Sequence, residues 1–142
     1  MIPHIIRPAK SADEGYIFDS WLRSMAHDLS IPDDDGERRR FWRAQKLVVA
    51  ACLKHGKTLV ACSRLDQDEI MGWACAEPPG LLHFVVVKGG CQRQGLCREL
   101  VKALGMAPAA KASHHTARGF PRVRRCFESL ELDVMASEGD AA

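Results

Sequence analysis

Residues 81–104, LLHFVVVKGGCQRQGLCRELVKAL, decide the fold of this chain. The apolar run at 81–87 is rich in β-branched residues, which predicts a strand covered on both faces. Gly89 and Gly90 end the run, and apolar residues at helical spacing then predict a helix that opens within residues 92–97. Such a turn presents free N–H groups and the positive end of a helix dipole. The segment therefore predicts a phosphate-binding turn, with an ordinary strand-to-helix turn without a ligand as the alternative.

Length and composition predict a single folded domain. The chain has 142 residues, 46% of them hydrophobic, and a formal net charge of +2, which by itself gives no argument for nucleic-acid binding. No stretch approaches the ~20 apolar residues that span a bilayer, and the first residues lack the apolar core of a signal peptide. We therefore expect one domain at 1–135, no membrane contact, a cytoplasmic location and a disordered acidic tail at 136–142.

The cysteines are interpreted as free thiols. They lie mostly within apolar runs and form no CxxC pair, which is typical of buried thiols in a reducing compartment. No Cys/His cluster has zinc-ligand spacing, so we expect no metal site. Cys91 and Cys97 flank the glycine turn, but no neighbouring His or Asp supports a nucleophilic role, and packing is preferred. The six cysteines are Cys52, Cys62, Cys75, Cys91, Cys97 and Cys126.

The N-terminal half predicts one strand and two helices. A short strand at 4–7 precedes Ser11 and Glu14, which have the spacing of a capping box for a helix that runs to about residue 29. A second helix is expected at 37–54, and the three arginines at 38–40 oppose its dipole. These arginines form either a solvated basic face or an anion contact. The apolar face of the first helix consists of Ile17, Phe18, Trp21, Leu22 and Met25.

The C-terminal half continues the alternation of strands and helices. Strands at 57–64 and 69–77 are expected to form an antiparallel pair joined by a polar turn, and the strand and helix of residues 81–104 follow. A strand at 111–116, a helix at 120–130 and a last strand at 130–135 complete the order β-α-α-β-β-β-α-β-α-β. There are no internal repeats.

The glycine turn resembles the acyl-CoA-binding motif of the GNAT acyltransferase superfamily. That motif has the form Arg/Gln-x-x-Gly-x-Gly/Ala after a hydrophobic strand. Gln92 and Gly95 match it, while Cys97 stands where the family has Gly or Ala. The order of elements over residues 5–134 is also the order that this family shows.

A second stretch near the C-terminus adds to the resemblance. The family often carries Tyr-Glu-x-Leu-Gly-Phe on its last helix, and residues 127–132 read FESLEL here. Glu128 and Leu130 match. Phe127 replaces the tyrosine, whose hydroxyl in many family members protonates the departing thiolate.

The resemblance implies both a fold and a co-substrate. The implied fold is α/β (α+β), a mixed, largely antiparallel twisted sheet with helices on both faces, and the co-substrate is acetyl-CoA or another acyl-CoA. The backbone amides of the turn would hold the pyrophosphate, the strand would pair with the pantetheine arm as with an added strand, and the Val85 N–H would stabilise the thioester oxygen. The residues so implied are Val85, Val86, Val87, Gln92, Arg93, Gln94, Gly95, Leu96, Cys97 and Arg98.

The implied reaction is transfer of an acyl group, typically acetyl, to an amine by direct attack in a ternary complex. The attacking ammonium must lose a proton, so a base is required. The candidate bases are His83 inside the buried strand, Glu77 at the end of the preceding strand, and His114 or His115 on the strand after the helix. Because Phe127 has no proton to give, Ser129 or a water is expected to take the place of the acid.

The amine acceptor stays open between a small molecule, a protein and a nucleic-acid base. It would enter past the helical region, where Trp21 and Trp42 are interpreted as core residues and the acidic loop 33–35 as solvated. Two alternatives are a nucleic-acid-associated protein, a base-modifying transferase or a binder, and a non-catalytic CoA-binding or interaction module. A homodimer through residues 130–135 is a further option. The basic positions that favour nucleic acid are Arg38, Arg39, Arg40, Arg118, Arg122, Arg124 and Arg125.

Overall fold

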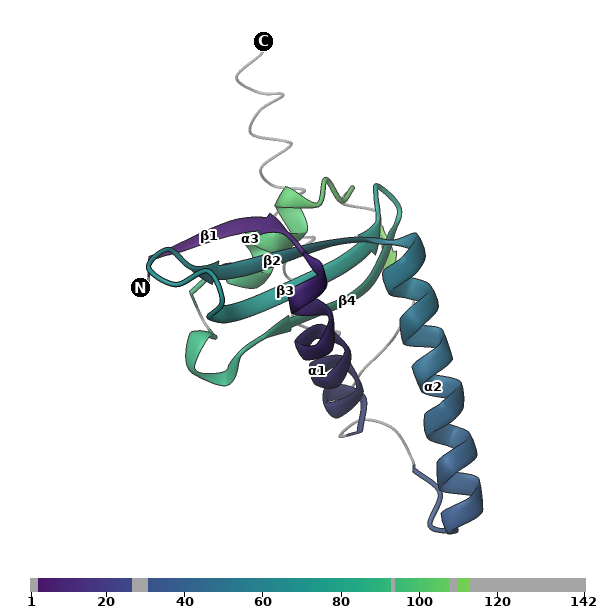
Figure 1. Ribbon diagram of the computed structural model, residues 1–142. Helices are drawn as coiled ribbons and strands as arrows, with labels where there is room; N and C mark the ends of the chain where they lie inside the picture. Colours follow the sequence, from purple (N-terminus) through teal and green to yellow (C-terminus); the bar gives the residue numbers. More distant parts are fainter. Residues whose placement is uncertain (1–2, 27–30, 93, 108–109, 113–142) are drawn as a thin grey trace.

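A five-stranded sheet forms the centre of the molecule (Figure 1). The computed structural model describes residues 3–26, 31–92, 94–107 and 110–112. The strands follow one another in space as they do in sequence, in the order β1-β2-β3-β4-β5. Their bounds are His4–Pro8 for β1, Lys57–Ser63 for β2, Ile70–Glu77 for β3, Leu81–Val87 for β4 and Lys111–Ala112 for β5.

The sheet is mixed and largely antiparallel, as the resemblance implies. β1 to β4 pair antiparallel in succession, whereas β4 pairs with β5 in parallel. Among the described residues, that parallel pairing joins only Leu81 to Lys111 and Leu82 to Ala112. From His83 onward, no described strand lies against the outer edge of β4.

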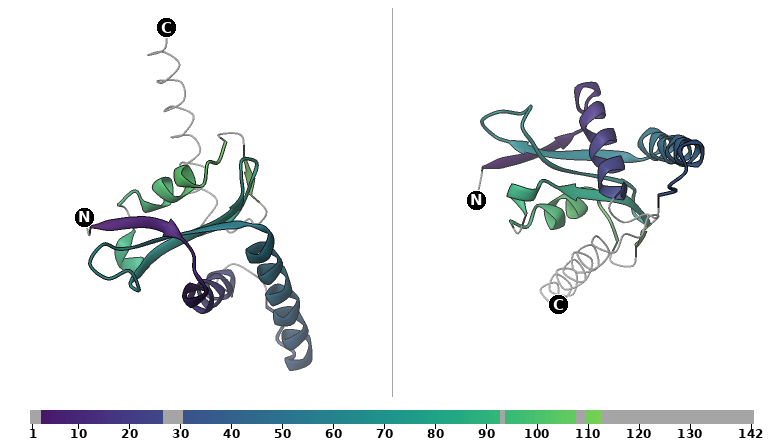
Figure 2. Two further views of the ribbon diagram at one scale, coloured as in Figure 1. Left: turned by 45° about the horizontal axis from the view of Figure 1, so that its top comes forward. Right: turned by 90° about the horizontal axis from the view of Figure 1, so that it is seen from below.

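Helices cover both faces of the sheet, which confirms a second prediction. α1 (Glu14–Ala26) and α2 (Asp35–His55) lie on one face, and α3 (Leu96–Ala103) lies on the other (Figure 2). α2 is long enough to extend beyond the sheet at its N-terminal end (Figure 1). Its buried residues, Val49 and Cys52, accordingly lie in the C-terminal part that packs against the strands.

Two hydrophobic cores result, one on each face. The face under α1 and α2 holds a stack of three aromatic rings: the centroids of Trp21 and Trp73 and those of Trp21 and Phe84 are each 5.3 Å apart. Such ring pairs contribute roughly 0.5–1.5 kcal/mol each beyond their buried area. The Trp73 indole also donates to Ser20 Oγ at 2.8 Å, which fastens α1 to the sheet. The face under α3 is lined by smaller side chains, with Leu96, Leu100 and Val101 of the helix at its centre.

β4 contains a β-bulge at His83. Leu82 pairs with Ala76 and Phe84 pairs with Cys75, so His83 has no opposite residue on β3. The extra residue shifts the alternation of side chains by one position. Leu82 consequently belongs to the core under α3, whereas Phe84 belongs to the core under α1 and α2. His83 is 7% exposed and is a member of neither core.

The start of α1 differs from the expected capping box. The short 3-10 helix Ser11–Asp13 precedes α1, and the side chain of Asp13, not that of Ser11, accepts a backbone hydrogen bond, from the N–H of Lys10 at 2.9 Å. The same carboxylate binds the Arg7 guanidinium through two hydrogen bonds of 2.6 and 3.1 Å. The Arg7 guanidinium, six residues earlier on β1, therefore helps to place the carboxylate of Asp13 at the start of the helix, which the capping-box motif alone does not show.

Of the two other helices, α2 begins at a position that differs from the prediction and α3 begins where it was expected. α2 starts two residues earlier than expected, because Asp34 caps it by accepting from the Glu37 N–H at 3.0 Å. Arg38 is exposed, and its guanidinium also donates to the carbonyls of Pro32 and Asp33 in the preceding loop. α3 begins at Leu96, after a 3-10 turn at Gly89–Cys91, and this start lies within the predicted range of residues 92–97.

Of the predicted elements, the helix at 120–130 and the strand at 130–135 lie outside the described residues. The end of the first helix beyond Ala26 and the part of the fifth strand after Ala112 also lie outside them. The expected domain limits at 135 and the tail at 136–142 stay predictions.

Candidate functional site

The glycine turn between β4 and α3 forms a backbone cradle. Gly95 is the N-cap of α3 and has a φ of 77°, in the left-handed region that favours glycine. No side chain caps the first amides of the helix, and a Cβ placed on Gly95 would meet no atom within 4 Å. The same open space lies over Gly89 and Gly90. The turn therefore presents uncapped N–H groups to a space that can take an anion.

One side chain of the glycine turn has a buried hydrogen-bond acceptor to which no described group donates. Gln94 Oε1 is buried and accepts no hydrogen bond within the described part of the chain. Gln92 reaches back across the turn, and its Nε2 donates to the Val87 carbonyl at 3.3 Å. Arg98 is exposed on the first turn of α3, and Cys97 beside it is half-buried. An unmatched buried acceptor fits a ligand that brings its own hydrogen-bond donor.

The outer edge of β4 presents backbone groups above the cradle. Lys88 donates its N–H to the Met71 carbonyl at 2.8 Å, which makes these two residues a hydrogen-bonded pair. Because hydrogen-bonded and non-hydrogen-bonded pairs alternate along an antiparallel ladder, Val87 and Val85 are members of non-hydrogen-bonded pairs with β3. Their N–H and C=O groups thus point to the outer edge, whereas those of Val86 point to β3. Of the three valines in the predicted set, the geometry favours Val85 and Val87 as backbone partners of a ligand.

The other end of β4 carries a carboxylate–imidazole pair. His83 Nε2 lies 2.8 Å from Glu77 Oε2, across the strand ends of β3 and β4. The His83 side chain is 7% exposed and that of Glu77 is 46% exposed, so the pair connects a buried ring to solvent. Each residue was predicted separately as a candidate base, and the structure brings the two together. A base held by a carboxylate is the arrangement that proton-transfer sites use.

Two buried thiols lie close to this pair. Burial raises the pKa of the Cys75 thiol to about 11, and it also raises the pKa of Cys52. The negative charge of Glu77 adds to the rise of both pKa values. Cys75 Sγ lies 3.5 Å from the Cys52 carbonyl. Both thiols are therefore protonated at neutral pH and act as packing groups, as the sequence predicts for the cysteines.

Several predicted site residues lie outside the described part of the chain. They are Arg93, His114, His115 and Ser129, and their roles stay predictions. The sequence missed the bulge at His83 that brings its ring to Glu77. A histidine inside a β-branched run was the available signal, but the register that turns it toward β3 is a property of the paired strands.

Neither a metal site nor a membrane helix is found in the described residues. No three His, Cys, Asp or Glu side chains there are grouped so that they could hold a metal ion. None of the helices in the described ranges is both long and apolar enough to cross a bilayer.

Comparison with known proteins gives matches at the level of structure. No family model and no curated protein sequence matches the chain. The protein yncA from Salmonella typhimurium, assigned as an acetyltransferase and solved with its cofactor acetyl-CoA, matches with a TM-score of 0.50 and 19% identity, over 89% of this chain and 78% of that chain. At this identity the likeness is one of fold, and it confirms the GNAT-like fold that the resemblance implied.

Two other solved structures match less well. Ribosomal-protein-S5-alanine acetyltransferase from Vibrio fischeri has a TM-score of 0.42 and 17% identity, over 72% of this chain and 62% of its own. A Drosophila protein has a TM-score of 0.45 and 19% identity, over 74% of this chain and 31% of its own. The chain thus spans less than two thirds of the length of each of these two proteins.

Proposed function

We propose that the protein is an acyl-CoA-dependent N-acyltransferase, with acetyl-CoA as the preferred donor and an amine as the acceptor. One observation carries the proposal: the outer edge of β4 has no described strand partner from His83 onward, and it connects two functional ends. One end runs into an uncapped helix start, and the other holds the Glu77–His83 pair. The GNAT-like fold shared with yncA, which was solved with acetyl-CoA as its cofactor, supports the same function.

The cradle fits the pyrophosphate of acyl-CoA. Gly95 lets the backbone turn without a side chain over the open space, and the amides that follow it donate to an anion at the positive end of α3. The edge groups of Val85 and Val87 would hold an extended amide-bearing arm in the manner of an added strand. The buried Gln94 Oε1 is suited to accept from a hydroxyl or amide of the same ligand.

The pair at the other end would supply the proton acceptor. The His83 imidazole would take the proton of the attacking amine, and the Glu77 carboxylate 2.8 Å from its Nε2 would stabilise the imidazolium that results. The Val85 N–H at the open edge donates to the oxygen on which negative charge develops. Acyl-CoA itself supplies the thioester carbonyl and a thiolate with a pKa near ~8.5, which leaves without a strong acid.

We place the enzyme in the cytoplasm as part of the same proposal. Cys52, Cys62, Cys75 and Cys91 are buried free thiols in the described residues. Thiols in this state suit a reducing compartment.

Acetyl-CoA binding by titration calorimetry tests the proposal. Gly95→Glu places a carboxylate into the space over the cradle and should weaken acetyl-CoA at least about tenfold, a difference of ~1.4 kcal/mol. Gly105→Glu is the matched control, because Gly105 has a similar φ of 76° and similarly open surroundings at the far end of α3. It should bind as the unchanged protein does.

Two results would overturn the proposal. One is the absence of binding by acetyl-CoA and by longer acyl-CoA compounds to the unchanged protein. The other is equal weakening in Gly95→Glu and Gly105→Glu, since backbone strain and not the cradle would then explain the loss.

A further inference from the structure

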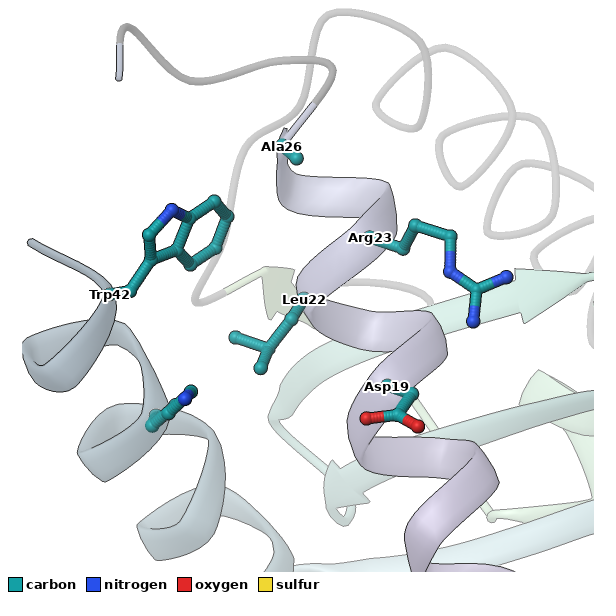
Figure 3. A pocket seen from close by; sticks show the side chains of 6 residues that line it. Asp19, Leu22, Arg23, Ala26 and Trp42 are labelled. Carbon is teal, nitrogen blue, oxygen red and sulfur yellow. The ribbon is translucent and has the colours of Figure 1, made fainter. Parts of the chain in front are cut away.

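A shallow groove between α1 and α2 lies on the face of the sheet opposite to α3, and Trp42 lines it (Figure 3). Trp42 was predicted to be a core residue, yet it is only half-buried, because α2 extends past the sheet and no described strand covers it (Figure 1). Trp42 and Leu22 point toward each other, whereas Asp19 and Arg23 lie on the side of α1 turned away from Trp42 (Figure 3). The groove is therefore open and apolar, and it gives no argument for a particular ligand.

A carboxylate–imidazole pair on the other face of the sheet joins β1 to α3. His4 Nε2 lies 2.5 Å from Glu99 Oε2. The side chain of His4 is 11% exposed and that of Glu99 is 46% exposed. Because side chains alternate along a strand, His4 shares the face of Ile6, which packs against the core under α3. The pair therefore ties the first turn of α3 to β1, which lies at the edge of the sheet away from β4.

Glu99 is the acidic residue nearest to the cradle in the sequence. Residues 88–104 contain no other Asp or Glu, while Lys88, Arg93, Arg98 and Lys102 are basic. The Glu99 N–H donates to the Gly95 carbonyl at 3.0 Å, which is the first hydrogen bond of α3. The N–H groups of residues 96–98 precede that bond, and no side chain caps them. The Glu99 carboxylate thus belongs to the same helical turn as the amides that form the cradle.

A carboxylate in this turn competes with an anion that binds at the helix start. A negative side chain in the first turn interacts favourably with the positive end of the helix dipole, which is also the end that would attract a pyrophosphate. An unrestrained Glu99 would therefore weaken the attraction and repel the ligand. In the structure the His4 ring binds the carboxylate from the side of β1. When the ring is protonated, its charge also offsets that of Glu99.

We propose that His4 is a positioning residue for the binding of acyl-CoA. By holding the Glu99 carboxylate toward β1, it keeps the amides of residues 96–98 available to the pyrophosphate. The inference rests on the proposed function, because it concerns the same cradle. It adds two side chains, His4 and Glu99, that the resemblance did not indicate.

Calorimetry with acetyl-CoA on a double-mutant cycle tests the role of His4. His4→Ala releases the carboxylate and should weaken acetyl-CoA binding about three- to tenfold at low salt, with a smaller loss at high salt. His4→Gln keeps a side-chain N–H donor and should restore most of the affinity. Glu99→Gln removes the charge and should bind at least as tightly as the unchanged protein. The double variant with His4→Ala and Glu99→Gln should bind as Glu99→Gln alone does.

Lys10→Ala is the matched control, because it breaks a different ion pair, that of Lys10 Nζ with Asp68 Oδ1 at 3.9 Å, and changes nothing on α3. It should leave the affinity for acetyl-CoA unchanged. Thermal unfolding shows that each variant is folded at the temperature of the titration.

Three results would overturn the role of His4 while the unchanged protein still binds acetyl-CoA, so that the proposed function stands. They are full affinity in His4→Ala, weaker binding in Glu99→Gln, and an equal loss from His4→Ala when residue 99 is Gln, since packing and not the carboxylate would then explain the loss. If the unchanged protein does not bind acetyl-CoA, this inference and the proposed function are both wrong.

Discussion

The two ends of β4 offer two different kinds of chemistry on one strand. At its start, a bulge brings the His83 side chain to Glu77, so recognition and proton transfer there depend on side chains. At its end, the chain turns through Gly95 into an uncapped helix, and the available groups are backbone N–H donors. This difference predicts which property, reaction rate or ligand affinity, a substitution at each end of the strand should change. Side-chain changes at the start should alter rate, whereas changes of backbone conformation at the end should alter ligand binding.

The largest effect is expected at the start of the strand. His83→Asn keeps a polar side chain of smaller size but removes the base, so kcat for acetyl transfer should fall by about 10²- to 10⁴-fold. Acetyl-CoA affinity should stay unchanged, since His83 is not part of the cradle. Steady-state kinetics and calorimetry on the same preparation measure both quantities. If His83→Asn also lost affinity for acetyl-CoA, the proposal that the two ends of β4 serve separately in proton transfer and in ligand binding would be wrong.

A change far from β4 should affect stability alone. Asp13 is 4% exposed at its side chain, and its partner Arg7 is 13% exposed, so Asp13→Asn leaves a largely buried guanidinium without its counter-ion. The free energy of unfolding at neutral pH should fall by about 3 kcal/mol. Denaturant titration measures it, and kcat should be unchanged at temperatures where the variant is folded.

The same pair makes stability depend on pH in a known direction. The Arg7 guanidinium lowers the pKa of the Asp13 carboxyl in the folded state, below its ordinary value of ~3.9. The folded state therefore binds this proton less readily than the unfolded state does. The stabilisation is complete above the unfolded pKa and is lost as the pH falls through the folded pKa. The stability difference between Asp13→Asn and the unchanged protein should thus shrink on acidification, and a difference that grows would contradict this assignment.

A smaller effect should appear when the two left-handed glycines are compared. Gly95→Ala and Gly105→Ala force a Cβ into φ values of 77° and 76° in otherwise open surroundings, which costs about 1–2 kcal/mol at each position. Thermal unfolding should show similar losses for both. Only Gly95→Ala should also alter the affinity for acetyl-CoA. If the two variants bind acetyl-CoA equally well, the turn conformation at Gly95 has no role in the cradle.

The smallest expected effect is a protection of Cys97. This thiol is half-buried on the first turn of α3, whereas Cys75 is fully buried with a pKa raised to about 11. Saturating acetyl-CoA should slow alkylation of Cys97 by iodoacetamide several-fold and leave Cys75 unreactive throughout. Peptide mapping by mass spectrometry distinguishes the two sites. An alkylation rate of Cys97 that does not respond to acetyl-CoA would exclude the thiol from the ligand-covered surface.

Sequence reasoning predicted the strands and the layers well, because each depends on a local repeat. The apolar run of β4 coincides with the observed strand Leu81–Val87, and the apolar face of the first helix is the one that α1 buries. Helix starts were predicted less well. The start of the first helix depends on the Arg7–Asp13 ion pair, and the loop before α2 depends on hydrogen bonds from Arg38 to backbone carbonyls. Neither a capping motif nor a charge count represents these contacts.

The candidate site was predicted as a set of residues but not as an arrangement. His83 and Glu77 were proposed as alternative bases, and only the strand register makes them partners. Trp42 was assigned to the core because its neighbours are apolar, and the length of α2 places it in a groove instead. In both cases the missing information is the relative position of two elements, which no single stretch of chain contains.

The extra residue in β4 has a consequence for how this protein can change over time. His83 is 7% exposed, so a residue that replaces it has to fill the same space beside the bulge as well as meet the needs of the reaction. A lineage that exchanged the reaction would therefore have to change the packing around residue 83 together with its chemistry.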